Sequence, residues 1–401
     1  MISLGKIIDR RRRTFRGNTS TGSLFDLRDL IRNKKALTTT VAVFLAIILF
    51  LTYTVYTNTV KYDSYTVLEE LDISDGEGSQ YVAFQNFFIK YGPDGISYLN
   101  GKNVVWSQAF EMTNPIVDTC GNYAAIADKG TNTIYIFDKT GLQGKVETSF
   151  PIISIEVAKQ GVVAALQEES DANYIEVFNK QGSKLVSHKT VMGINGYPLS
   201  FSISDDGTKM VVSYVCVTNG SMESKLTFYN FSDVGQNEVD RMVGGFNDFK
   251  STVIPTVKFV TNDIVVAVGD NMLAFYKMKE KPSEIKKVEI KDEFKKVFFN
   301  DKYVGLVFND INNGAINRVV AYNLSGKVVM NQSVDMEFDK ISFTKKNIII
   351  NDDLNCRIIS FKGKERFEGA FNEDITEIIP TGKFREYLMI TNNNVRRIKI
   401  K

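Results

Sequence analysis

The chain has 401 residues, of which 43% are hydrophobic and 24% are charged, the proportions of a folded protein rather than a disordered one. Its formal net charge of +2 conceals an asymmetry, because residues 1–35 hold ten Lys/Arg and three Asp/Glu, whereas residues 62–401 hold 38 Lys/Arg and 44 Asp/Glu. An acidic body excludes a general nucleic-acid-binding surface, and one histidine with three cysteines leaves little material for histidine-based catalysis or a zinc site.

The first predicted segment is a basic head over residues 1–35. Residues 23–35 place apolar side chains on one face of a short helix, and a run of four arginines precedes this helix at positions 10–13. A polybasic, amphipathic segment of this kind is attracted to anionic lipid headgroups. The candidate headgroup contacts are Arg10, Arg11, Arg12, Arg13, Lys34 and Lys35. The alternative is that these charges serve only to orient membrane insertion.

An uncharged stretch follows at residues 36–60, with the apolar core VAVFLAIILFL at residues 41–51. About 20 helical residues span the ~30 Å hydrocarbon core of a bilayer, so the stretch predicts a transmembrane helix over residues 36–57. A buried core helix would rarely run so long without a charge. A cleaved signal peptide is the second alternative, but no Ala-x-Ala site follows the apolar run. We expect an uncleaved anchor in the cell membrane, with the head in the cytoplasm and residues 58–401 outside.

The body contains short β-branched and aromatic runs separated by Asn, Asp and Gly turns, a pattern typical of an all-β fold. The runs pair into eight predicted hairpins. They lie at residues 87–101, 123–141, 161–182, 210–233, 263–278, 303–326, 347–363 and 387–401. Recurrence about every 40–45 residues, with a further strand on each side, is the signature of a β-propeller. Two packed β-sandwiches would not explain one period.

The pattern favours eight blades, with seven as the alternative. The last repeat stops at Lys401 before its outer strand, and one strand-like run, residues 65–71, remains unassigned after the apolar stretch. We therefore predict that residues 65–71 complete the eighth blade, which removes an exposed sheet edge.

One stretch of the body resembles a known family. Residues 90–141, and most specifically the segment from Pro115 to Gly141, are similar to a bacterial family of unknown function, found mostly in Gram-positive lineages. The resemblance extends to the basic head and the single span. It implies a quinoprotein-like propeller ectodomain on a single-pass membrane anchor, and it implies no activity.

Few side chains suggest catalysis or metal binding. Trp106 is the only tryptophan and is expected to pack between blades, whereas quinoprotein dehydrogenases need several. His188 has no second histidine to share a metal and is interpreted as a surface residue. Cys120, Cys216 and Cys356 fall in blades that are not neighbours, so they predict no disulfide. We expect no catalytic residue, no cofactor and no metal site.

Blade four carries the longest insertions, at residues 218–225 and 233–249, and Phe246 and Phe249 are candidate partner-binding loop residues there. The sequence as a whole favours a non-enzymatic binding or scaffold module for an envelope protein or polymer. The alternative function is a quinoprotein-like ectoenzyme.

Overall fold

The computed structural model describes residues 34–72, 79–85, 87–100, 103–218, 220–310, 314–344, 346–391 and 394–401. The chain divides into two compact units, residues 1–60 and residues 61–401. In the first unit, helix α2 (Lys34–Thr59) covers the apolar stretch. Within the described residues, we find no helix with both the length and the apolar character needed to cross a membrane. The membrane anchor proposed for residues 36–57 stays a prediction.

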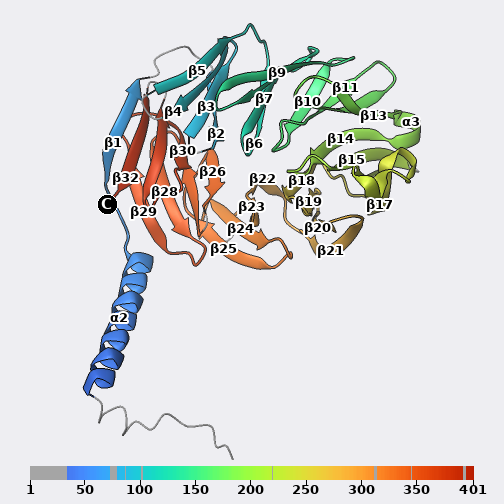
Figure 1. The fold of residues 1–401 in the computed structure, drawn as a ribbon. Coiled ribbons are helices and arrows are strands. Elements are labelled where there is room, and N and C mark those ends of the chain that lie inside the picture. Colours follow the sequence, from blue (N-terminus) through green and yellow to red (C-terminus); the bar gives the residue numbers. More distant parts are fainter. Residues whose placement is uncertain are drawn as a thin grey trace, which may run out of the picture. The chain divides into compact units, whose positions relative to one another are not determined.

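The second unit is a ring of eight four-stranded antiparallel sheets (Figure 1), which confirms eight blades rather than seven. Blade 1 consists of β2 (Gln80–Phe84), β3 (Phe87–Gly92), β4 (Gly95–Asn100) and β5 (Asn103–Ala109). Blade 2 consists of β6 (Pro115–Cys120), β7 (Tyr123–Asp128), β8 (Thr133–Asp138) and β9 (Gly141–Glu147). Blade 3 consists of β10 (Ile152–Val157), β11 (Val163–Glu168), β12 (Asn173–Phe178) and β13 (Lys184–Thr190). Blade 4 consists of β14 (Tyr197–Ile203), β15 (Lys209–Thr218), β16 (Ser221–Asn230) and β17 (Met242–Phe249).

The remaining blades repeat this up-and-down order. Blade 5 consists of β18 (Thr256–Thr261), β19 (Ile264–Val268), β20 (Met272–Met278) and β21 (Pro282–Glu289). Blade 6 consists of β22 (Phe294–Phe299), β23 (Tyr303–Asn309), β24 (Asn317–Asn323) and β25 (Val328–Val334). Blade 7 consists of β26 (Lys340–Phe343), β27 (Asn347–Asn351), β28 (Asn355–Ser360) and β29 (Glu365–Ala370). Blade 8 consists of β30 (Ile375–Pro380), β31 (Glu386–Thr391), β32 (Asn394–Ile400) and β1 (Tyr65–Asp72).

Blade 8 closes the ring with strands from two distant parts of the chain. Strand β1 pairs antiparallel with β32, from Tyr65 opposite Ile400 to Asp72 opposite Asn394. Two ion pairs support the seam, Arg397–Glu69 at 2.6 Å and Arg396–Glu70 at 2.9 Å. This closure confirms the assignment of residues 65–71 to the last blade.

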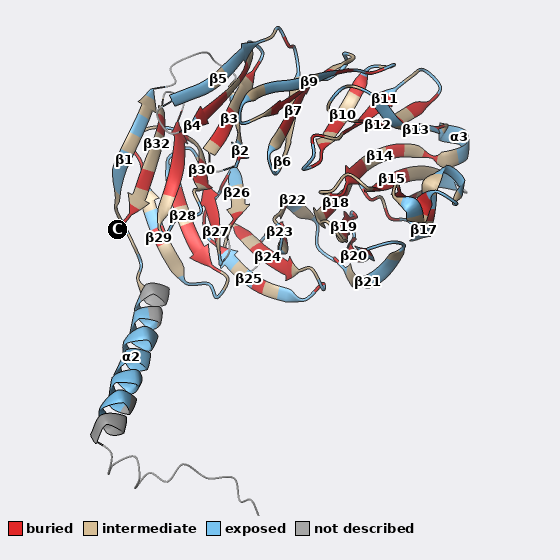
Figure 2. Ribbon diagram, viewed as in Figure 1, coloured by how far each residue is buried: buried red, intermediate tan, exposed pale blue. Residues whose placement is uncertain are grey.

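Packing between blades forms the core. The middle strands are buried on both faces, whereas the outermost strands of each blade are exposed (Figure 2). Blade 2 illustrates the pattern, because β7 reads YAAIAD and its alanines let the neighbouring blades approach closely. Trp106 stacks on Phe137 of the next blade at 4.8 Å and donates its Nε1–H to the Asp138 carbonyl at 3.0 Å. The expectation that Trp106 packs between blades is confirmed.

Blade 4 differs from its predicted outline. Most of the first insertion belongs to strands, because β15 and β16 each extend to ten residues and pair as far as Thr218 and Ser221. The second insertion folds into two short 3₁₀ turns, η2 (Asp233–Gly235) and η3 (Val239–Arg241), followed by β17. A short helix, α3 (Met192–Asn195), precedes the blade.

Candidate functional site

The up-and-down order of the strands sorts the connections of the ring onto two faces. The hairpins between second and third strands and the links between blades lie on one face. The hairpins between first and second strands and between third and fourth strands lie on the other, together with the chain ends at residues 61–64 and Lys401. The two faces carry opposite charge, and we name them the acidic face and the basic face.

Acidic residues dominate the first of these faces. Its described connections hold fifteen carboxylates and three lysines. The carboxylates belong to Asp94, Glu111, Glu169, Asp171, Asp270, Asp292, Glu293, Asp310, Asp335, Glu337, Asp339, Asp352, Asp353, Glu373 and Asp374. Ten of the fifteen lie between residues 292 and 374, around blades 6, 7 and 8. Arg318 pairs with Asp292 at 2.7 Å, Arg396 pairs with Glu373, and Lys295 lies 3.9 Å from Glu337, so three of the ten have a cationic partner.

The basic face has the opposite balance. Its described connections hold fifteen Lys/Arg and nine Asp/Glu. The difference in charge between the two faces is largest around blades 6, 7 and 8. The basic face holds nine cations there, from Lys302 to Lys401 and including Lys61, and only two carboxylates, Asp301 and Asp63. Sequence reasoning missed this difference in charge between the two faces. Every second predicted turn lies on the same face, so grouping alternate turns and comparing their charges would have revealed it.

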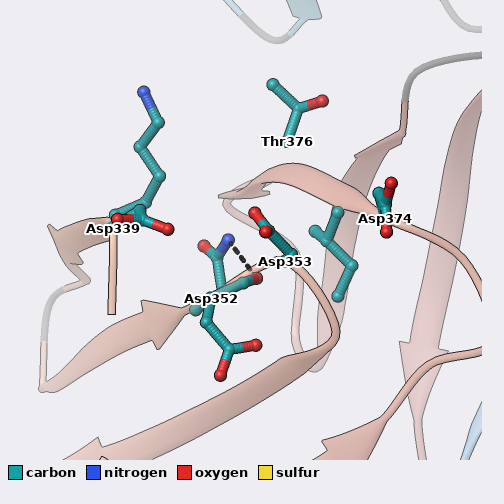
Figure 3. A pocket seen from close by; sticks show the side chains of 8 residues that line it. Asp339, Asp352, Asp353, Asp374 and Thr376 are labelled. Carbon is teal, nitrogen blue, oxygen red and sulfur yellow. Dashed lines mark hydrogen bonds between the residues drawn. The ribbon is translucent and has the colours of Figure 1, made fainter. Parts of the chain in front are cut away.

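A pocket of about 280 Å³ opens on the acidic face between blades 7 and 8 (Figure 3). Its lining comprises Asp339, Lys340, Asn351, Asp352, Asp353, Asp374, Ile375 and Thr376. Backbone hydrogen bonds join its walls, from Ile375 N–H to the Asp353 carbonyl at 2.6 Å and from Asp339 N–H to the Asn351 carbonyl at 3.0 Å. The pocket is therefore a fixed junction between two blades rather than a gap between loops.

The pocket carboxylates are held in different ways. Asp352 accepts hydrogen bonds from the backbone N–H groups of Leu354 and Asn355, at 2.8 Å and 2.6 Å, so it caps its own turn. Asp352 thus forms an Asx turn. Asp353 lies between Asp339 and Asp374 in Figure 3. Among the described residues, no group of three or more His, Cys, Asp and Glu side chains could hold a metal ion.

A second polar cluster joins the innermost strands of blades 2 to 5. The carboxylate of Asp118 accepts the Val157 N–H at 2.7 Å. The carboxylate of Glu156 accepts the Ser202 hydroxyl at 2.9 Å, the Ile203 N–H at 2.8 Å and the Lys258 ammonium at 2.7 Å. Each first strand is thereby tied to the next by a side chain, and Lys258 of β18 reaches back to β10. Sequence reasoning missed this cluster, because its members look like ordinary polar positions of separate strands.

Burial and mutual interaction shift the pKa values in this cluster. Burial raises the pKa of Asp118 to about 6, although the nearby Lys258 ammonium opposes the rise. Burial lowers the pKa of Lys258, but Glu156 and Asp118 outweigh it and the net shift is upward. Lys258 therefore stays charged and compensates two carboxylates, which is the role of a structural ion pair.

The expectation that His188 is a surface residue is wrong. His188 on β13 is half-buried, and its Nε2 lies 2.8 Å from the hydroxyl of Tyr229 on the next blade. Burial lowers the pKa of His188. A pocket of about 230 Å³ adjoins this pair, with Asp240 and Arg241 on its rim. The imidazole thus contributes to packing between blades 3 and 4.

The two phenylalanines predicted to lie in a partner-binding loop occupy a strand instead. Phe249 ends β17 and is only 2% exposed, and Phe246 packs against Phe228 and Tyr276 at 5.9 Å and 4.6 Å. The glycines at positions 244 and 245 concealed this strand in the sequence, because they lack the side chains that mark β structure. Phe249 is therefore a core residue, and Phe246 is a half-buried residue packed against the same core.

The side chains of the predicted headgroup contacts lie outside the described part of the chain. Arg10, Arg11, Arg12 and Arg13 fall outside the described residues, and Lys34 and Lys35 begin α2 without described side chains. The cysteines are all free, with Cys356 buried and Cys120 and Cys216 half-buried. Burial raises the pKa of the Cys120 thiol to about 12, so it stays protonated.

Comparison with known proteins extends these findings. A family model described as a family of unknown function, DUF5711, matches residues 57–400. No curated protein matches the chain. The ring is similar to BamB from Moraxella catarrhalis, with 12% identity, 84% of this chain and 100% of that chain covered, and a TM-score of 0.51. It is also similar to Sqt1 from Chaetomium thermophilum, with 10% identity, 84% and 100% coverage, and a TM-score of 0.53. Identities this low show a shared propeller fold alone.

Proposed function

The chain belongs to the DUF5711 family, and from its own residues we propose that it is a membrane-anchored, non-enzymatic binding propeller outside the cytoplasm. In this proposal the acidic face binds a cationic partner, a basic protein segment or a positively charged envelope polymer. The ring acts as a rigid scaffold that holds the partner near the membrane. The observation that carries the proposal is the concentration of carboxylates between residues 292 and 374 on one face.

Charge complementarity supports this assignment. A surface of one sign attracts partners of the opposite sign and rejects others, and it accelerates their encounter. Asp339, Asp353 and Asp374 line a pocket wide enough for a lysine or arginine side chain, and the carboxylates of the lining outnumber its one ammonium, that of Lys340. Rigid blades on both sides keep the entropic cost of binding low.

A binding measurement tests the acidic face. We expect the full-length chain to bind a fluorescent oligolysine peptide at low salt and to release it as salt shortens the screening length. Replacing Glu337, Asp339, Asp353 and Asp374 by their amides should remove about 2 kcal/mol, or about 30-fold in Kd, at ~0.5 kcal/mol for each exposed charge.

The matched control changes the same number of charges on the basic face. Replacing Asp63, Asp233, Glu280 and Asp301 by their amides gives the same change in net charge. It should leave the affinity for oligolysine nearly unchanged. Equal loss in both variants would mean that the peptide senses net charge, and the acidic face would not be the binding site.

Topology is tested separately, by labelling with a membrane-impermeant maleimide in intact cells. In a chain whose three native cysteines are replaced by alanine, a cysteine introduced in place of Leu354 should be labelled from outside, and one introduced in place of Gly17 should not. The reason is the excess of positive charge before the uncharged stretch, which retains the head in the cytoplasm. The reverse pattern of labelling would overturn the proposed location.

A further inference from the structure

The chain enters the ring at the edge of the basic face. The ammonium of Lys61 lies 2.7 Å from both the Glu365 and the Glu368 carboxylates. Tyr62 N–H donates to the Arg366 carbonyl at 2.8 Å, which fixes residues 61–62 alongside the beginning of β29. The uncharged stretch ends at Val60, one residue before this attachment.

A tight turn of blade 8 lies next to this attachment. In residues 381–385, the Thr381 hydroxyl donates to the Glu386 carbonyl at 3.0 Å, and Arg385 adopts a positive φ of 61°. The guanidinium of Arg385 lies over the rings of Tyr62, at 5.1 Å, and Phe384, at 5.0 Å. Ile400 N–H donates to the Arg385 carbonyl at 3.1 Å. The turn is thereby joined to the incoming chain and to the closing seam.

Phe384 occupies the tip of this turn and is 59% exposed. Among the described residues of the ring, it is the one aromatic side chain exposed to this degree. Lys383 and Arg385 flank it, and the neighbouring blade 7 turn places Lys362 and Lys364 on the same face. An apolar ring surrounded by cations matches the interface of an anionic bilayer, where aromatic rings lie among the headgroups and cations meet phosphates.

We propose that the 381–385 turn docks the ring on an anionic lipid leaflet, with Phe384 inserted among the headgroups and the surrounding lysines on phosphate groups. This inference rests on the membrane anchor proposed above. Docking would orient the ring, because contact of the basic face with the membrane directs the acidic face and its pocket away from it. A free partner would then reach the acidic face without obstruction.

The experiment uses the full-length chain reconstituted into vesicles of phosphatidylglycerol and phosphatidylcholine. In the Phe384→Trp variant, the added tryptophan emission should shift to shorter wavelength, and brominated lipids should quench it at least two-fold. The parent chain provides the signal of Trp106 for subtraction. Leu354→Trp, on a blade 7 turn of the acidic face, is the matched control and should remain unquenched, since Leu354 is also exposed.

Charge dependence is tested in the same vesicles. Replacing Lys362, Lys364 and Lys383 by glutamine should abolish most quenching at position 384, as should vesicles of phosphatidylcholine alone. The same change at Lys129, Lys250 and Lys291 on the acidic face should leave quenching intact. If the chain floats with the vesicles but the tryptophan introduced by Phe384→Trp is not quenched, the docking proposal is wrong and the anchor stands. If the chain does not float with them, the anchor itself fails and the docking proposal fails with it.

Discussion

A chain that begins at residue 79 and lacks β1 is expected to be strongly destabilised relative to one that begins at Lys61. The deletion removes the seven register pairs between β1 and β32 and the ion pairs of Arg396 and Arg397 with Glu70 and Glu69. At about 0.5–1.5 kcal/mol for each lost hydrogen bond, the free energy of unfolding should fall by roughly 5 kcal/mol. Urea unfolding monitored by circular dichroism measures the difference.

The deletion also exposes the whole length of β32 as an open edge. An unpaired edge strand recruits other chains, so the shortened protein should aggregate when the longer one stays monodisperse. Adding a synthetic peptide of residues 61–72 should reduce the aggregation, because it restores the missing strand. Equal stability and solubility of the two chains would mean that the ring closes without β1.

The fold was predictable because its signals are local and repeated. Each hairpin, such as residues 123–141, carries its own β-forming runs and turn residues. Eight such repeats at one spacing are typical of a propeller. The closing strand was predictable because two strands were each left without a pairing partner in the predicted blades, residues 65–71 and residues 394–400. The failures fall where a strand lacks β-formers, as at residues 244–245 before Phe246.

The candidate site was less predictable because its parts are remote in sequence. The pocket joins Asp339, Asp353 and Asp374 from three connections, and no local motif announces that they meet. Lys258 and Glu156 are separated by 102 positions, and only the ring brings them within hydrogen-bond distance. Phe384 is one of 28 phenylalanines in the sequence, and only the structure shows that its ring is exposed and that the Arg385 guanidinium lies over both this ring and that of Tyr62.

The second large effect is expected for Lys258→Met, which should destabilise the ring more at pH 8 than at pH 5. The substitution leaves Glu156 and Asp118 without their compensating charge. A loss of about 1.5–3 kcal/mol at pH 8 is the value for a hydrogen bond to a charged group. We place it below the ~3–5 kcal/mol of a completely buried pair, because the Lys258 side chain remains 39% exposed.

The direction of the pH dependence follows from the pKa of Asp118. That pKa is about 6 in the folded chain and ordinarily 3.8, so the folded state binds more protons between these values, and stability declines as the pH rises through about 6. Removing Lys258 raises the folded pKa further, which deepens the penalty at pH 8. At pH 5 the carboxyl of Asp118 is protonated in the folded state, and the penalty shrinks.

Two further variants make this prediction decisive. Combining Lys258→Met with Glu156→Gln should recover part of the stability at pH 8, because it removes the charge of Glu156 and its repulsion of Asp118 while the amide oxygen still accepts the Ser202 and Ile203 hydrogen bonds. Lys281→Met breaks the exposed pair with Glu238, which has the same 2.7 Å distance, and should cost at most about 1 kcal/mol. Urea unfolding of each variant at both pH values provides the measurement. Equal deficits at pH 5 and pH 8, or no recovery in the double variant, would show that Lys258 stabilises the ring by packing and not by charge.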